Sequence, residues 1–369
     1  MSLSSLASAI GRPRNLPYAF GAMHTIVDAS TVSVVVGASL LHSLPLERAF
    51  TLVLTYDLIA FGAQTFFGAL VDRVARPRAA VLLGLLFTAA CVAIAPVEPT
   101  AAMLLAGVGN ALFHVGAGTL TLCMGRGRAA PSGLFVGPGA LGLGFGTWLG
   151  RQGIYQPWPF YLALALCLGV TLLFRDPETY AVVPDAPTSA DEPAPRSPIP
   201  FASVVVGLLL FSITIRSLVG FAGSHGCPRG PTTLVALTLA AFSGKTLGGF
   251  VSDRFGWMGV SVGALLLSAP LIAFGTGNLL LIVPGMFLFQ MTMPVTLSAV
   301  ALVMPKRPAL AFGLTCLALI LGTLPTFTHA FDAYYRAESF LLLIGLSALA
   351  LFGGLRALRP APRARVALA

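Results

Sequence analysis

His24 and Asp28 lie four positions apart, and both carry groups that can gain and lose a proton. Residues four apart share one face of an α-helix. The surrounding stretch, "AMHTIVDAS", is mostly apolar, and an ionisable group in such a stretch normally faces a cavity or a partner. Two interpretations follow: Asp28 carries a transported proton, or the two residues form a static pair that stabilises their helix.

Further ionisable residues interrupt long apolar runs, although burying a charge in lipid costs roughly 2.5–3.5 kcal/mol. Asp57 precedes Asp72 by fifteen positions, or about 22 Å along a helix. It is a candidate second proton site, a candidate outer gate or a structural residue. Arg216 is always charged, so it either pairs with Asp28 or Asp57 or binds an anionic substrate.

His114, Lys245 and Gln290 are candidate substrate-binding residues because they also stand in apolar surroundings. His114 could equally be a core histidine whose hydrogen bonds are satisfied within the protein. Lys245 has a long apolar stem that lets its ammonium group extend toward the membrane surface. All three remain candidates for a cavity inside the membrane.

The stretch "SGKTLGGFVSDRFG" (243–256) contains Gly-Lys-Thr, the end of a phosphate-binding P-loop. The complete motif, G-x-x-x-x-G-K-[ST], needs a glycine at position 239, where this chain has Leu239. The zinc-protease motif H-E-x-x-H is absent, and no soluble domain is available to hold a cofactor. We therefore expect neither an enzyme nor a cofactor.

A metal exporter is an alternative, because His24, Asp28 and His114 could bind a divalent ion. No carboxylate-rich or thiolate cluster accompanies them, and a central Arg216 would repel a cation. We expect no resident metal site.

The composition is that of a membrane protein. Of 369 residues, 56% are hydrophobic and 9% charged, whereas soluble domains carry about 25% charged residues. Mean hydropathy is +0.88, and runs of about 18 or more apolar residues indicate membrane spans. Twelve spans are predicted: 17–43, 49–71, 79–97, 100–124, 132–151, 157–174, 201–222, 232–252, 257–275, 278–304, 308–329 and 338–357.

Positive charge is distributed unevenly between the loops. If the N-terminus is cytoplasmic, sixteen of the 22 Lys and Arg residues fall in cytoplasmic segments and four in outer loops. Cytoplasmic loops carry an excess of Lys and Arg, so we expect both termini inside, in a bacterial inner membrane. The net charge of +9 then reflects topology beside an anionic lipid leaflet and does not indicate nucleic-acid binding.

The chain also contains an internal repeat. Residues 175–200 are rich in Pro, Ala and acidic groups and predict a flexible linker. It separates residues 1–174 from 201–369, with six spans in each. "GAQTFFGALVDR" (62–73) matches "GKTLGGFVSDR" (244–254) at a shift of 181 residues, and "MGRGRAAPSG" matches "MPKRPALAFG" at a shift of 180.

These features resemble the major facilitator superfamily, whose G-x-x-x-D-R signature stands twice in a chain of twelve spans. The resemblance implies that the signature residues gate one face of the membrane, where glycine lets helices approach and Asp and Arg form charge-assisted bonds. The matching positions are Gly68, Asp72, Arg73, Gly249, Asp253 and Arg254.

Within that superfamily the chain resembles the fosmidomycin-resistance group of exporters, through "AMHTIVDAS", "GNALFHVGAGTL" and "SITIRSLVGF". The span 132–151 is similar to an antiporter signature at Gly133, Gly137, Pro138 and Gly142. In the family that signature marks exporters that work by exchange. The alternative is ordinary packing of small residues between helices.

The sequence therefore predicts an all-α membrane protein with twelve transmembrane helices in two pseudo-symmetric six-helix bundles, the major facilitator fold. We expect a monomeric secondary transporter that exports a small organic solute, anionic or amphipathic, in exchange for protons. Proton-coupled uptake of an organic acid and export of a divalent metal or metal chelate are the alternatives. Proton coupling is assigned to Asp28, His24 and Asp57.

Overall fold

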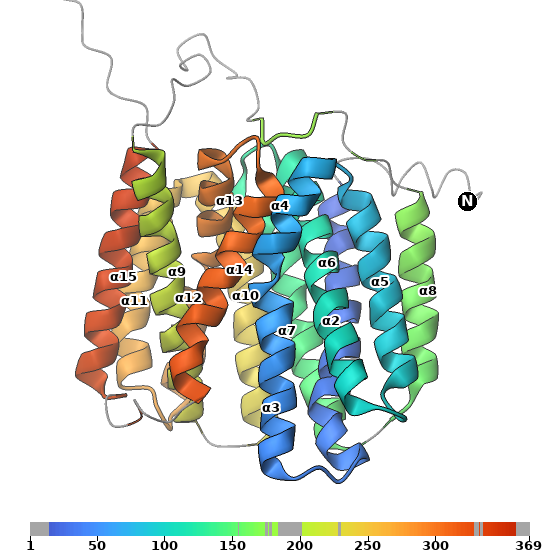
Figure 1. Ribbon diagram of the computed structural model, residues 1–369. Helices are drawn as coiled ribbons and strands as arrows, with labels where there is room; N and C mark the ends of the chain where they lie inside the picture. Colours follow the sequence, from blue (N-terminus) through green and yellow to red (C-terminus); the bar gives the residue numbers. More distant parts are fainter. Residues whose placement is uncertain are drawn as a thin grey trace, which may run out of the picture.

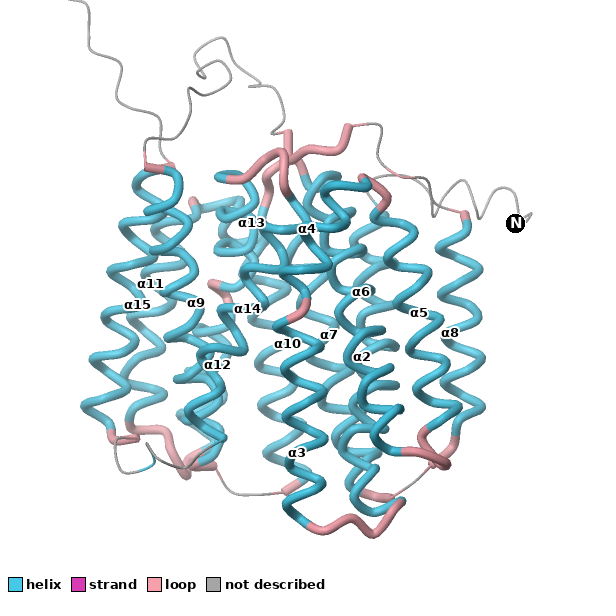
Figure 2. Tube along the Cα trace, in the orientation of Figure 1, coloured by secondary structure: helices cyan, strands magenta, loops and turns pink. Residues whose placement is uncertain are grey.

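The computed structural model describes residues 15–153, 155–173, 176, 179–183, 201–227, 230–327, 332 and 335–358. Both ends of the chain and most of the predicted linker 175–200 lie outside these residues. Throughout the described part, the regular elements are helices, which run roughly parallel to one another (Figure 1). Figure 2 shows the same arrangement with short loops at the two ends of the helices.

Six helical segments make up the described part of the first half of the chain. The second of them is interrupted by one turn of π-helix, so that α3, η2 and α4 together form the single span Leu46–Val74. The elements are α2 (Leu16–Leu41), α3 (Leu46–Asp57), η2 (Leu58–Gly62), α4 (Gln64–Val74), α5 (Pro77–Ile94), α6 (Pro99–Gly125), α7 (Ala129–Arg151) and α8 (Pro157–Leu172).

The second half follows the same plan. Here α12 and α13 form the single span Leu279–Val303, with a break at Met291 and Thr292. The elements are α9 (Ala202–His225), α10 (Pro231–Phe255), α11 (Trp257–Ala273), α12 (Leu279–Gln290), α13 (Met293–Val303), α14 (Pro308–Phe327) and α15 (Ala337–Ala357).

These twelve segments coincide with the twelve predicted spans to within about 3 residues at each end, an error usual for helix boundaries. Several begin with proline, whose missing N–H is not needed in the first turn of a helix. Nine segments of the described chain are long and apolar enough to cross a membrane, and α8 and α11 are shorter apolar helices. The remaining segment, α7, is rich in glycine, which adds length but little hydropathy.

The glycines of α7 explain why this helix lies at the centre of the molecule. An added Cβ at Gly133 would collide with the backbone of α10, and one at Gly142 would collide with the backbone of α2. The Thr25 hydroxyl also donates a hydrogen bond of 2.8 Å to the carbonyl of Pro138 within α7. Small residues thus let α7 contact α2 on one side and α10 on the other.

Candidate functional site

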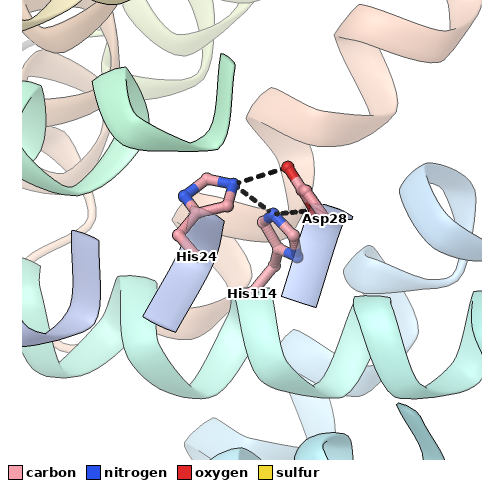
Figure 3. Close-up of side chains that lie close together, drawn as sticks. All are labelled: His24, Asp28 and His114. Carbon is pink, nitrogen blue, oxygen red and sulfur yellow. Dashed lines mark hydrogen bonds and ion pairs between the residues drawn. The ribbon is translucent and has the colours of Figure 1, made fainter. Parts of the chain in front are cut away.

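Three titratable side chains meet inside the first half of the molecule (Figure 3). Helix α2 places His24 and Asp28 one turn apart, and α6 supplies His114 from 90 residues away. The Nε2 atoms of His24 and His114 are 2.7 Å apart. Asp28 Oδ2 lies 3.1 Å from Nε2 of His24, and Asp28 Oδ1 lies 3.6 Å from Nε2 of His114. We call His24, Asp28 and His114 the proton cluster.

Backbone carbonyls fix the protonation pattern of both imidazole rings. Nδ1 of His24 is 2.8 Å from the carbonyl oxygen of Phe135, and Nδ1 of His114 is 2.8 Å from that of Asn110. Because a carbonyl oxygen only accepts hydrogen bonds, both Nδ1 atoms carry a hydrogen. In two neutral rings, the two Nε2 atoms would then face each other with lone pairs. A hydrogen bond across their 2.7 Å contact would need one additional, shared proton.

The carboxylate of Asp28 would balance the charge of such a shared proton. Its Oδ1 accepts a hydrogen bond of 2.9 Å from Nδ2 of Asn110, one turn before His114 on α6. One proton on the two imidazoles gives a charge of +1 beside a charge of −1, so the protonated cluster is neutral. A neutral arrangement avoids the desolvation cost of an unpaired charge in an apolar interior.

The same three side chains have the donor types of a divalent-metal site, since their ligand atoms lie within 4.8 Å of one another. Two nitrogen ligands of a tetrahedral zinc ion, at about 2.0–2.1 Å each, would be roughly 3.4 Å apart. The observed separation of 2.7 Å is shorter and is a hydrogen-bond length. The spacing thus fits a shared proton better than a metal ion.

Asp28 is the most exposed member of the proton cluster, with 15% of its side chain accessible against 7% for His24. The carboxylate interacts electrostatically with Lys245 of α10, which belongs to the second half of the chain. Within the described residues Lys245 has no hydrogen bond or ion-pair contact. Asp28 therefore faces the boundary between the two halves, opposite a cation.

Arg216 lies on α9 in the second half, and its side chain is buried. The guanidinium donates to the hydroxyl of Thr292 and, at 2.8 Å, to that of Thr296. These threonines lie where α12 gives way to α13. In the part of the chain that the structure describes, no carboxylate lies within ion-pair distance of Arg216, and its Nε has no acceptor. Of the two interpretations of Arg216, pairing with Asp28 or Asp57 is therefore not observed among the described residues.

The other predicted residues are distributed around the centre. Gln290 is the last residue of α12, and its Cβ lies close to Gly244, the neighbour of Lys245. Asp57 ends α3 immediately before the π-helical turn and, among the described residues, makes no hydrogen bond or ion pair. The structure therefore brings His114 into the proton cluster and leaves Asp57 outside it.

The repeated signature forms a second site, at the uppermost face in Figure 1, which we call the Asp72 face. The Asp72 carboxylate accepts hydrogen bonds from the backbone N–H groups of Ala309 and Leu310, at 3.0 and 2.8 Å. These residues form the first turn of α14, in the other half of the chain. A carboxylate at this position accepts hydrogen bonds from N–H groups that have no partner within the helix. Its negative charge is also attracted to the positive end of the helix dipole.

Asp253 makes the equivalent contact in the opposite direction. Its carboxylate accepts from the N–H groups of Ala129 and Ala130, at 2.9 and 2.8 Å, in the first turn of α7. The donor residues at the two sites are 180 positions apart, and the acceptors are 181 apart, as in the sequence repeat. Each half therefore uses its aspartate to bind the start of a helix in the other half.

Gly68 and Gly249 allow these contacts, because each lies against the backbone that its neighbouring aspartate binds. Arg73 and Arg254 are exposed and, within the described chain, form no hydrogen bond or ion pair. The expected Asp–Arg bonds are thus replaced by Asp–backbone bonds. The physical reason is that an arginine one position further along the helix points about 100° away, toward solvent.

Sequence reasoning missed four contributors to these sites. Asn110 precedes His114 by four residues, so the same spacing argument that paired His24 with Asp28 could have found it. Thr292 and Thr296 are also four apart, but threonines in membrane helices commonly bond to their own backbone and give no specific signal. Tyr180, which donates to Asp72, stands in the predicted linker and had no signal.

No family model matches the chain, and no curated protein matches it. Solved structures do share its fold. One is a variant of the E. coli fucose:proton symporter FucP, with a TM-score of 0.67 and 13% identity over 95% of this chain and 100% of that chain. A structure of FucP in the outward conformation gives a TM-score of 0.62 and 15% identity over 95% of this chain and 100% of that chain.

The human organic anion transporter MFSD10 (TETRAN) gives a TM-score of 0.69 and 18% identity over 91% of this chain and 98% of that chain. Similarity at this level of identity shows the fold. The predicted major facilitator fold is thereby confirmed, and the solved structures that share it are those of transporters.

Proposed function

We propose that the protein is a proton-coupled secondary transporter in which the proton cluster takes up and releases the coupling proton. The observation that carries this proposal is the 2.7 Å contact between Nε2 of His24 and Nε2 of His114, with both Nδ1 atoms bound to carbonyls. That geometry stores one proton beside Asp28, at the boundary between the two halves.

Release of the proton changes the charge at this boundary. The cluster is neutral with its proton and carries −1 without it, when the free Asp28 carboxylate attracts Lys245 of the other half more strongly. Proton occupancy therefore biases how closely the two halves approach. This is the differential interaction that couples a ligand to a conformational equilibrium.

Arg216 is proposed to bind the substrate. Among the described residues, the buried guanidinium is held by two threonine hydroxyls and its Nε has no acceptor, which leaves its charge available to an anion. The substrate proposed is thus a small organic anion or an amphipathic molecule. One solved structure of the same fold is described as that of an organic anion transporter and another as that of a fucose:proton symporter.

Export by exchange is the proposed direction, and it rests on the glycine and proline pattern of α7 and on the resemblance to fosmidomycin-resistance exporters. Proton-coupled uptake of an organic acid uses the same residues and remains the alternative. We place the Asp72 face on the cytoplasmic side, because the loops there carry most of the positive charge. We propose that the protein is a monomer and lies in a bacterial inner membrane.

The test is pH-gradient-driven flux in proteoliposomes that contain a pH-sensitive dye, with a panel of carboxylates and phosphonates as the solutes. The wild type should move protons when one of these solutes is added. Asp28→Asn should abolish gradient-driven net flux but retain solute exchange, because Asn keeps the size and hydrogen bonding of the carboxyl group. Asp57→Asn tests the second candidate proton site, which lies outside the cluster, and loss of gradient-driven flux in this variant but not in Asp28→Asn would assign the coupling proton to Asp57. Full gradient-driven flux in Asp28→Asn would remove the cluster from proton transfer.

A further inference from the structure

Residues 179–183, between the two halves of the chain, are docked on the Asp72 face. The Tyr180 hydroxyl donates a hydrogen bond of 2.8 Å to Oδ1 of Asp72. The N–H of Val182 donates at 2.9 Å to the carbonyl of Pro305, in the loop that precedes α14. The backbone of Ala181 contacts the thiol of Cys123 at the end of α6. In Figure 1 this segment crosses the uppermost face as a light-green trace.

These contacts attach one short segment to both halves at once. Tyr180 and Ala181 bind residues of the first half, and Val182 binds a residue of the second half. The side chain of Val182 is also only 2% exposed, so the segment is held by burial as well as by hydrogen bonds.

The two signature aspartates differ in their third donor. Asp253 receives it from Nε1 of Trp257, at 2.8 Å and four residues along the chain. That donor belongs to the same local run as Asp253 and can move with it. Asp72 receives its third donor from Tyr180, 108 residues away. The two copies of the repeat therefore make the same helix contacts. They differ in the third donor to the aspartate, which is local for Asp253 and distant in the sequence for Asp72.

We propose that residues 179–183 act as a strap that fastens the Asp72 face in its closed state, with Tyr180 as the positioning residue for the Asp72 carboxylate. To open this face, Asp72 must leave the N–H groups of Ala309 and Leu310. Because the strap is tied to both halves, separation must also break either the Tyr180 bond to Asp72 or the Val182 bond to Pro305. The strap rests on the proposed movement of the two halves relative to each other but not on which ion is coupled.

The phenol of Tyr180 keeps its proton under ordinary conditions. Burial, together with the negative charge of Asp72, raises its pKa well above the usual value. Tyr180 can therefore act as the hydrogen-bond donor to Asp72 across the physiological pH range.

The experiment measures the opening of the Asp72 face directly. Spin labels on Val74→Cys and Lys306→Cys, exposed positions in the first and second halves of the chain, report the distance between the halves at this face by pulsed electron paramagnetic resonance. The five native cysteines are buried and give a low labelling background. Tyr180→Phe should increase the ratio of long to short distances about tenfold, the effect of losing one hydrogen bond to a charged group.

Trp257→Phe is the matched control. It removes the third donor to Asp253 but leaves intact the contacts of residues 179–183 with the two halves. It should change the ratio much less than Tyr180→Phe. Equal effects of the two variants, or an unchanged distribution in Tyr180→Phe, would overturn the strap. Size-exclusion profiles and melting temperatures of both variants verify that the fold is retained.

A second measurement adds a covalent lock. Ala181→Cys should form a disulfide with the native Cys123, because the backbone of Ala181 already contacts that thiol. The oxidised protein should show only the short distance across the Asp72 face, and a reductant should restore the long one. A failure to crosslink, or opening while crosslinked, would contradict the docked strap. Because these readouts need neither substrate nor a pH gradient, they stand apart from the test of proton coupling.

Discussion

At the residue scale, the chemistry of this protein depends on which atoms of two histidines are already engaged. Backbone carbonyls occupy both Nδ1 atoms, so His24 and His114 can meet only through Nε2. This arrangement is the basis of the proposal that the two imidazoles share a single proton. Asn110 then orients Asp28 beside it. Functional histidines are commonly held in one tautomer and one orientation by a hydrogen bond from a ring nitrogen to a neighbouring group.

Arg216 gives a prediction at the same scale. Arg216→Gln should lose most affinity for an anionic solute, because the charge is gone. Arg216→Lys should retain part of it, because the ammonium keeps the charge but cannot reach Thr292 and Thr296 together as the planar guanidinium does. Thermal-shift titration of the purified variants with a carboxylate found in the flux panel measures this. Unchanged affinity in Arg216→Gln would assign Arg216 to structure.

At the scale of elements, helix α7 joins the two sites, and its glycines determine how. Gly139 lies against the imidazole ring of His24, Gly133 and Gly137 lie against α10, and the first turn of α7 is bound by Asp253. The glycines of α7 therefore allow this helix to pack closely against α2 and α10. Whether α7 also enforces exchange, as the antiporter-like pattern predicts, stays a prediction for transport assays.

Gly139→Ala tests the contact between α7 and the proton cluster. The added methyl group would overlap the His24 ring, so the ring must rotate away from His114, and overpacking of this kind costs about 1–3 kcal/mol. We expect a lower melting temperature and loss of gradient-driven flux. Gly207→Ala in α9, where an added Cβ meets nothing within 4 Å, is the control and should be neutral or slightly stabilising. Equal behaviour of the two variants would show that the His24 contact is unimportant.

At the scale of the whole molecule, the Asp72 face is closed by two equivalent contacts between the halves. Each aspartate caps a helix of the opposite half, and each neighbouring glycine brings the backbones together. Figure 1 shows α14 inclining away from α3 toward the lower end, while it contacts α4 and η2 above. Contacts between α14 and the Leu46–Val74 span are thus concentrated toward the Asp72 face.

Asp72→Asn and Asp253→Asn should each shift the molecule toward states that are open at this face. The neutral amide accepts the two N–H bonds less strongly than a carboxylate and loses the attraction to the helix dipole. The rate at which Cys123 is alkylated, followed by mass spectrometry, measures the opening, because this buried thiol lies beneath residue 181. Cys91, toward the opposite end of α5, is the reference. Unchanged Cys123 alkylation in both variants would remove the gating role.

The sequence alone determined the twelve helical segments, the repeat and the pairing of His24 with Asp28. Lipid forces every backbone group to bond within its own segment, so a long apolar run is sufficient evidence of a helix. A spacing of four residues then fixes which side chains share its face. The predicted division at 175–200 stays a prediction, although residues 179–183 are docked and do not behave as a free linker there.

Only the tertiary structure decided which helix faces meet. It brought His114 to His24 from 90 residues away, gave Arg216 two threonines instead of an aspartate, and gave Asp72 a helix terminus and Tyr180 instead of an arginine. The physical reason is that apolar helices in lipid gain little from one contact over another until small residues allow close approach. Those approaches depend on the three-dimensional arrangement of all the segments and are not encoded in the spacing along any one of them.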